Sequence, residues 1–195
     1  MTTKTKTPMT DELFETDELV ALARLDVEKG NIDQALARIK QALADATPPA
    51  EALTLGARLY AQLGLFERAQ VLYQRFLKSN PGAVIESFQL GMTHLDAGQP
   101  QEALAIWDAL LKDHPVHPPA LFYKALALSQ QGQPVDARHA LETLLKSAPA
   151  DNLYFGRGKE LLQTLDTGAA PGATIASPNK APRGLPQKDA YKIEH

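Results

Sequence analysis

Four glycines recur along the chain at a constant interval of 34 residues. Each is followed five residues later by an alanine, so two positions of every interval repeat together. A repeat period of roughly 20 to 50 residues is the signature of a solenoid, in which each unit leaves an apolar face for its neighbour to cover. The spacing therefore predicts a stack of similar units. The paired positions are Gly30 and Ala35, Gly64 and Ala69, Gly98 and Ala103, and Gly132 and Ala137.

Further positions repeat in the same frame and predict two helices in every unit. Each glycine ends the first helix, because glycine adopts the left-handed conformation at little cost. Prolines 34 residues apart end the second helix. One position of the first helix is always small, and one position of the second helix is large and apolar, as expected where two helices pack together. The small residues are Ala23, Ala57, Gly91 and Ala125, and the large ones are Ile39, Tyr73, Trp107 and Leu141.

This frame divides the chain into seven segments. The repeats are predicted at 16–49, 50–83, 84–117 and 118–151, after a polar N-terminal segment with a short cap at 1–15. Residues 152–166 have leucines at helical spacing and predict a solvent-facing capping helix, with Lys159 in the column that is otherwise small. Residues 167–195 are rich in glycine, alanine and proline, and predict a disordered tail.

The first unit departs from the pattern. Asp26 stands where the second unit has Tyr60, and this position is His94 in the third unit. A carboxylate in place of an aromatic ring predicts looser packing of the first unit, whereas the histidine is predicted to pack against a neighbouring helix.

Composition excludes several classes of protein. No apolar run approaches the roughly 18 residues of a transmembrane helix, and the N-terminus lacks the apolar stretch of a signal peptide, so the cytoplasm is the expected compartment. The absence of cysteine excludes disulfides and thiolate metal sites. A net charge of −3 provides no general attraction for nucleic acid.

The repeated glycine, alanine, small, large apolar and proline positions resemble the tetratricopeptide repeat (TPR) family over about three quarters of the chain. The resemblance implies an all-α fold, a right-handed α-solenoid of antiparallel helix pairs. It also implies a concave groove, lined by the first helices, that binds proteins or peptides. The lysine, asparagine and arginine clamp with which some members grip the acidic tail of heat-shock chaperones is missing.

No motif predicts catalysis, and we expect neither a cofactor nor a metal. His114 and His117 flank a proline between two units, but no acidic residue follows at a spacing that completes a metal site, so both read as solvated turn residues. No serine lies in a nucleophile motif. Every repeat glycine is explained as a helix stop, which leaves no phosphate-binding loop.

The groove is therefore the candidate site, and its predicted lining has two halves. Arg24 and Arg58 lie one period apart, so they are stacked on successive helices and are suited to a carboxylate or an acidic stretch. The other half is apolar, as is typical of surfaces that bind a partner helix or an extended peptide. Its residues are Ile85, Phe88, Met92, Phe122, Tyr123 and Leu126.

Three functions fit this reading: an adaptor that binds a partner protein in the groove, a secretion-type chaperone that holds an apolar client segment, and an assembly or regulatory subunit of a larger complex. The tail offers a further contact, because its lysines and arginines outnumber its carboxylates and the rest of the chain is acidic. Within it, Ala190–Ile193 has the apolar anchors of a short docking motif.

Overall fold

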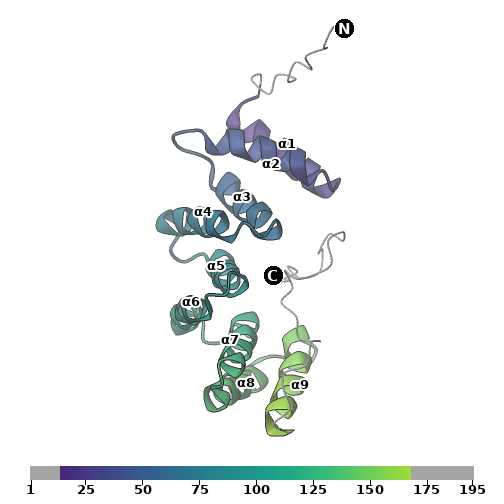
Figure 1. The fold of residues 1–195 in the computed structure, drawn as a ribbon, viewed down its shortest axis with the longest axis vertical. Helices are drawn as coiled ribbons and strands as arrows, with labels where there is room; N and C mark the ends of the chain where they lie inside the picture. The colour runs from purple at the N-terminus through teal and green to yellow at the C-terminus, as the bar shows by residue number, and fades with distance from the viewer. Residues whose placement is uncertain (1–13, 168–195) are drawn as a thin grey trace, which may run out of the picture.

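The computed structural model describes residues 14–167. The predicted N-terminal cap before Phe14 and the predicted tail after Thr167 lie outside the described residues. Every regular element in the described part is an α-helix, and consecutive helices pack as pairs along a stack (Figure 1), which confirms the all-α solenoid. The helices are α1 (Thr16–Glu28), α2 (Ile32–Leu43), α3 (Ala50–Gln62), α4 (Phe66–Ser79), α5 (Val84–Asp96), α6 (Pro100–Asp113), α7 (Pro118–Gln130), α8 (Pro134–Ser147) and α9 (Leu153–Thr167).

Each predicted unit contains one helix pair, although the unit boundaries themselves stay a prediction. The four glycines between paired helices have φ angles of 72° to 78°, the left-handed conformation predicted from the sequence. In the first turn, the Asn31 N–H donates to the Asp26 carbonyl at 2.8 Å and the Gly30 N–H donates to the Val27 carbonyl at 3.0 Å. This is the Schellman pattern, which satisfies carbonyls that the end of the helix would leave unpaired. The other three turns repeat it.

The repeated small and large positions meet inside each pair, as predicted. Ala23, Ala57 and Ala125 are fully buried, and the large residues of the second helices are at most 2% exposed. Gly91 replaces alanine in the third unit, where a Cβ atom would lie 2.2 Å from Trp107 Nε1. The largest core cluster runs from α5 to α9, and a separate cluster joins α1, α2 and α3.

The last helix differs from its prediction. α9 packs against both α7 and α8, and it therefore continues the stack. The small position is Gly158, whose Cβ would lie 2.7 Å from Leu144, and Lys159 is exposed. The period is thus one residue shorter at this point, because α9 must bring its glycine onto α8.

Candidate binding surface

The exposed side chains of the first helices α1, α3 and α5 form a continuous surface, here called the first-helix face and defined by Arg24, Glu51, Arg58, Ile85 and Phe88. An ion pair shows directly that α1 and α3 meet on this face. Arg24 Nη1 lies 3.2 Å from Glu51 Oε1, and both side chains are more than half exposed. The guanidinium of Arg24 is therefore already paired within the chain.

One period further along, the same geometry has different chemistry. Arg58 stands 34 residues after Arg24, but the position equivalent to Glu51 is Ile85. Arg58 is exposed, and within residues 14–167 no carboxylate forms an ion pair with it. Ile85 is 48% exposed. The helix contact that holds a salt bridge between α1 and α3 thus presents a guanidinium beside an apolar side chain between α3 and α5.

Phe88 lies one turn after Ile85 and is half-buried. Its ring centroid is 6.2 Å from that of Trp107 and 5.8 Å from that of Tyr123. The Trp107 Nε1–H also donates to the Phe88 carbonyl at 3.3 Å. These contacts fix the ring, so the exposed part of Phe88 is a preorganised apolar contact, which lowers the entropy cost of binding.

The predicted apolar half of the groove is mostly core, and this part of the prediction is wrong. Met92, Phe122, Tyr123 and Leu126 are at most 2% exposed. Helix α9 accounts for much of this burial: the guanidinium of Arg157 lies 4.9 Å from the ring centroid of Phe122, and the ring of Tyr154 contacts both Phe122 and Tyr123. Of the six predicted apolar residues, Ile85 and Phe88 alone keep exposed surface.

Burial also changes the chemistry of Tyr123. It raises the pKa of the Tyr123 hydroxyl above its ordinary value of 10, and the neighbouring Tyr154 adds to the effect while Arg157 opposes it. The phenol is therefore neutral at physiological pH and acts as part of the apolar core.

The histidines provide structural contacts. His94 Nδ1 lies 2.7 Å from Gln99 Oε1, which agrees with its predicted packing role. His114 is exposed as predicted, but His117 is half-buried: its ring lies 5.5 Å from that of Phe88, and its Nδ1 accepts the Ala120 N–H at 3.2 Å. His117 is thus the N-cap of α7, a role that sequence reasoning missed although its place before two prolines at a helix start was a signal.

Burial lowers the pKa of His117, and the charge of His114 lowers it further. The neutral imidazole that this favours is the form that can accept the capping hydrogen bond. In the described part of the chain, no cluster of three or more His, Cys, Asp or Glu side chains is arranged to hold a metal ion.

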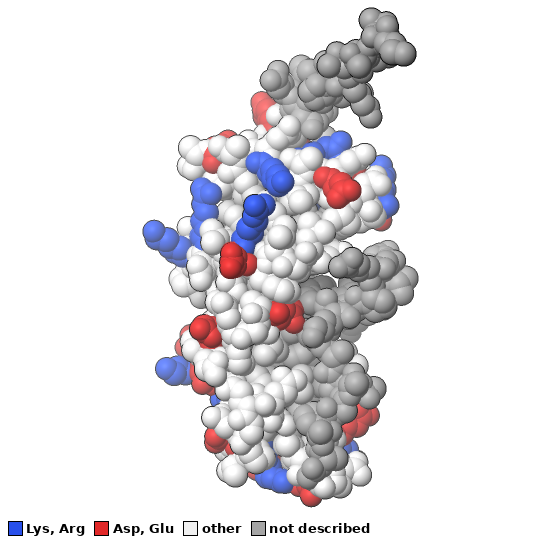
Figure 2. Space-filling view, viewed as in Figure 1, with Lys and Arg blue, Asp and Glu red and all other residues white. Residues whose placement is uncertain are grey.

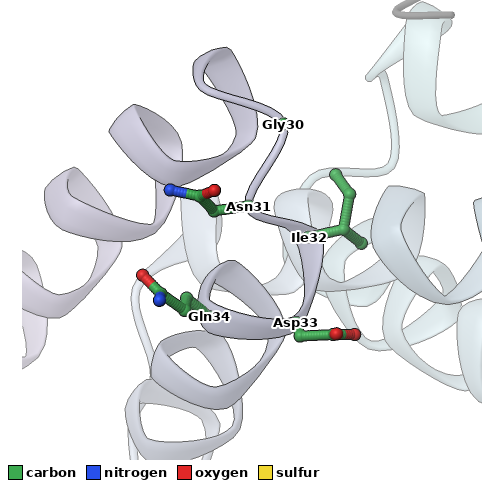
Figure 3. Close-up of a pocket in the computed structure, with 5 residues that line it drawn as sticks. All are labelled: Gly30, Asn31, Ile32, Asp33 and Gln34. Atoms are coloured by element: carbon green, nitrogen blue, oxygen red, sulfur yellow. The ribbon is translucent and has the colours of Figure 1, made fainter. Parts of the chain in front are cut away.

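A shallow depression of about 310 Å³ lies at the turn between α1 and α2, lined by residues Gly30 to Gln34. Figure 3 shows that its side chains do not converge: Asn31 and Gln34 point to one side of the turn, and Ile32 and Asp33 point to the other. Since a ligand pocket needs a few polar groups aimed at one point, this depression is a feature of the helix turn.

Charge is unevenly spread over the face shown in Figure 2. Lys and Arg side chains gather over α1 to α4, and the surface over α5 to α8 is mostly uncharged. These cations lie in the same half of the stack as Arg24 and Arg58, so they favour the approach of a ligand whose acidic part is directed there. Among residues 14–167, no helix has the length and apolar character needed to cross a membrane.

Comparison with known proteins supports the repeat architecture. The family model described as tetratricopeptide repeat matches residues 20–84, 88–152 and 124–173. Among solved structures, YrrB, described as a TPR protein with an unusual peptide-binding site, has a TM-score of 0.67 and 19% identity over 74% of each chain. MamA from Desulfovibrio magneticus RS-1 has a TM-score of 0.65 and 21% identity over 82% of this chain and 92% of that one. No curated protein sequence matches the chain significantly.

Proposed function

The chain belongs to the tetratricopeptide repeat family, and from this premise we propose that it binds an extended segment of a partner protein along the first-helix face. The observation that carries the proposal is Arg58 beside Ile85, where the equivalent pair one period earlier is the salt bridge of Arg24 and Glu51. The ligand is a peptide with a carboxylate close to an apolar side chain.

Each part of the site supplies a different kind of recognition. Arg58 binds the carboxylate, since a guanidinium forms two parallel hydrogen bonds with it. Ile85 and the fixed ring of Phe88 bind the apolar side chain. The likeness to YrrB, whose description names a peptide-binding site, is consistent with a peptide as the ligand class. Catalysis has no part in the proposal, and its compartment is the cytoplasm.

The proposal is tested by selecting peptides from a random display library on the immobilised full chain. We expect enriched peptides with an acidic residue near an aliphatic or aromatic one. Arg58→Glu and Ile85→Asp should each weaken binding of a selected peptide at least about tenfold, because each removes one half of the recognition.

Val71→Asp is the matched control, since Val71 on α4 is 60% exposed and lies away from the first-helix face. Thermal melting of all three variants should stay close to that of the parent chain, because the substituted side chains are exposed. If selected peptides bind Arg58→Glu and Val71→Asp equally well, the first-helix face is not the site.

The adaptor is the first choice among the three functions because a charged residue is central to the site. A secretion-type chaperone instead needs a mainly apolar groove, and four of the six residues predicted to form one are core. The two are distinguished by co-expression: a chaperone keeps an otherwise insoluble client in solution, and an adaptor does not. A subunit of a larger complex would co-elute with that complex from native lysate.

A further inference from the structure

The chain carries, in its own C-terminal segment, the chemistry that the first-helix face is built to bind. Residues 190–194 read Ala-Tyr-Lys-Ile-Glu, with Ile193 directly before the carboxylate of Glu194. We propose that this segment docks on the first-helix face of the same chain and occupies the peptide site until a partner displaces it. The inference rests on the proposed function and names its first ligand.

The pattern of the segment matches the surface when the segment is extended. Alternate residues of an extended chain point to opposite sides, so Tyr191 and Ile193 share one side, and Lys192 and Glu194 share the other. The apolar side faces Ile85 and Phe88 on α5. The charged side faces α3, on which Glu51 and Arg58 are two helical turns apart, roughly 10 Å. Lys192 then pairs with Glu51, and Glu194 pairs with Arg58.

Net charge favours the same arrangement. Residues 168–195 contain four lysines and arginines and two carboxylates, whereas the chain as a whole carries −3. The first helices share this acidity: α1 has four carboxylates against one arginine, and α5 has two carboxylates and neither lysine nor arginine. Attraction between a basic segment and acidic helices raises the rate and specificity of the encounter.

The connection is long enough. The chain leaves the described structure at Thr167, the end of α9, which packs on α7, and α7 contacts α5. Packed helices lie about 8–10 Å apart, so α9 and α5 are separated by roughly 20 Å. The chain from Thr167 to Tyr191 spans up to roughly 80 Å when extended. The segment therefore reaches every residue of the first-helix face.

Tethering makes a weak contact sufficient. A covalently linked ligand has an effective concentration on the order of 1 mM, so a segment with an intrinsic dissociation constant of about 0.1 mM occupies the site about nine-tenths of the time. It then lowers the apparent affinity of a competing peptide about tenfold. A partner that binds more tightly displaces the segment.

The docking is tested in the full chain by paramagnetic relaxation. Because the chain contains no cysteine, Ala190→Cys can be labelled with a nitroxide at one position. We expect strong broadening of the amide signals of Ile85 and Phe88, and unchanged signals for Val71 on α4 and Val135 on α8. Equal signals on both sets of residues, broadened or not, overturn the proposal.

A charge exchange tests the predicted pairing. Arg58→Glu should reduce the broadening at Ile85 at least about threefold, and adding Glu194→Arg to that variant should restore most of it. Glu142→Arg on α8 is the matched control and should restore nothing. If the control restores the broadening as well as Glu194→Arg does, general electrostatics holds the segment and the specific docking is refuted.

A final variant separates this inference from the proposed function. Tyr191→Ala with Ile193→Ala in the full chain should abolish the broadening and raise the affinity for a display-selected peptide about tenfold. If selected peptides bind through Arg58 with the same affinity in both chains, the docking fails and the proposed function stands. If no peptide is selected by either chain while the broadening is present, the proposed function fails.

Discussion

At the scale of single residues, Gly91 and Trp107 form a matched pair. The small position of the first helix is alanine in the other three units, but Trp107 is the largest residue at its position and leaves no room for a Cβ atom. We predict that Gly91→Ala lowers the free energy of unfolding by about 1–3 kcal/mol through overpacking. Urea denaturation measures the change.

The pairing itself is tested by a double-mutant cycle. Trp107→Leu alone leaves a cavity and should cost roughly 2 kcal/mol. Gly91→Ala with Trp107→Leu recreates the combination of Ala125 and Leu141 in the fourth unit, so the double variant should lose at least about 1 kcal/mol less than the sum of the single variants. Additive losses would show that the two residues are not coupled.

Residue-level sequence reasoning predicted the core positions better than the binding surface. The exposed Arg24, Arg58 and Ile85 were placed correctly, because the period puts equivalent residues at equivalent positions. Phe122 and Tyr123 were placed wrongly because helical periodicity does not show which neighbour covers a side chain. Their cover is α9, and the one-residue change of period at Gly158 could not be read from four regular units.

At the scale of helices, the start of α7 is coupled to pH through His117. Its Nδ1 accepts the Ala120 N–H only while the imidazole is neutral. Since the folded-state pKa lies below the unfolded value of 6.5, the unfolded chain binds the proton first. We therefore predict that this contribution to stability is complete above pH 6.5 and is lost as the pH falls through the lowered pKa.

His117→Asn isolates the effect, because asparagine is a good N-cap residue that does not titrate. Urea denaturation at pH values from 8 to 5 should show a smaller loss of stability in this variant than in the parent chain. His117→Ala should cost about 1 kcal/mol at pH 8 through the lost cap. His114→Asn should keep the dependence on pH, although in reduced form, because His114 contributes only part of the shift. An identical pH profile in the parent chain and His117→Asn would contradict the assignment.

At the scale of the whole molecule, the buried core is uneven along the stack. The cluster that runs from α5 to α9 includes Trp107, Phe122 and Tyr123, whereas the first unit buries Asp26, paired with Arg38, where the second unit has Tyr60. The desolvation of a buried ion pair offsets much of its attraction, so the charged pair stabilises the first unit less than a packed ring would.

Because a solenoid is held together only by contacts between neighbours, its units can open separately. We predict that amides of α1 and α2 exchange with solvent through a partial opening with a smaller free energy than that of global unfolding. Amides of α7, in which eight residues are buried, should exchange only through global unfolding. Native-state hydrogen exchange at increasing denaturant concentration measures both.

Two core truncations show whether the openings are independent. Val20→Ala, in the cluster of α1 to α3, should speed exchange in α1 and α2 and leave α7 unchanged. Leu141→Ala, in the cluster of α5 to α9, should speed exchange in α7 by a factor that matches its loss of global stability. Equal acceleration of both regions by Val20→Ala would mean that the stack unfolds as one cooperative unit. With independent openings, by contrast, α3 and α5 keep the first-helix face intact while α1 and α2 are open, so Val20→Ala should leave binding at Arg58 and Ile85 unchanged.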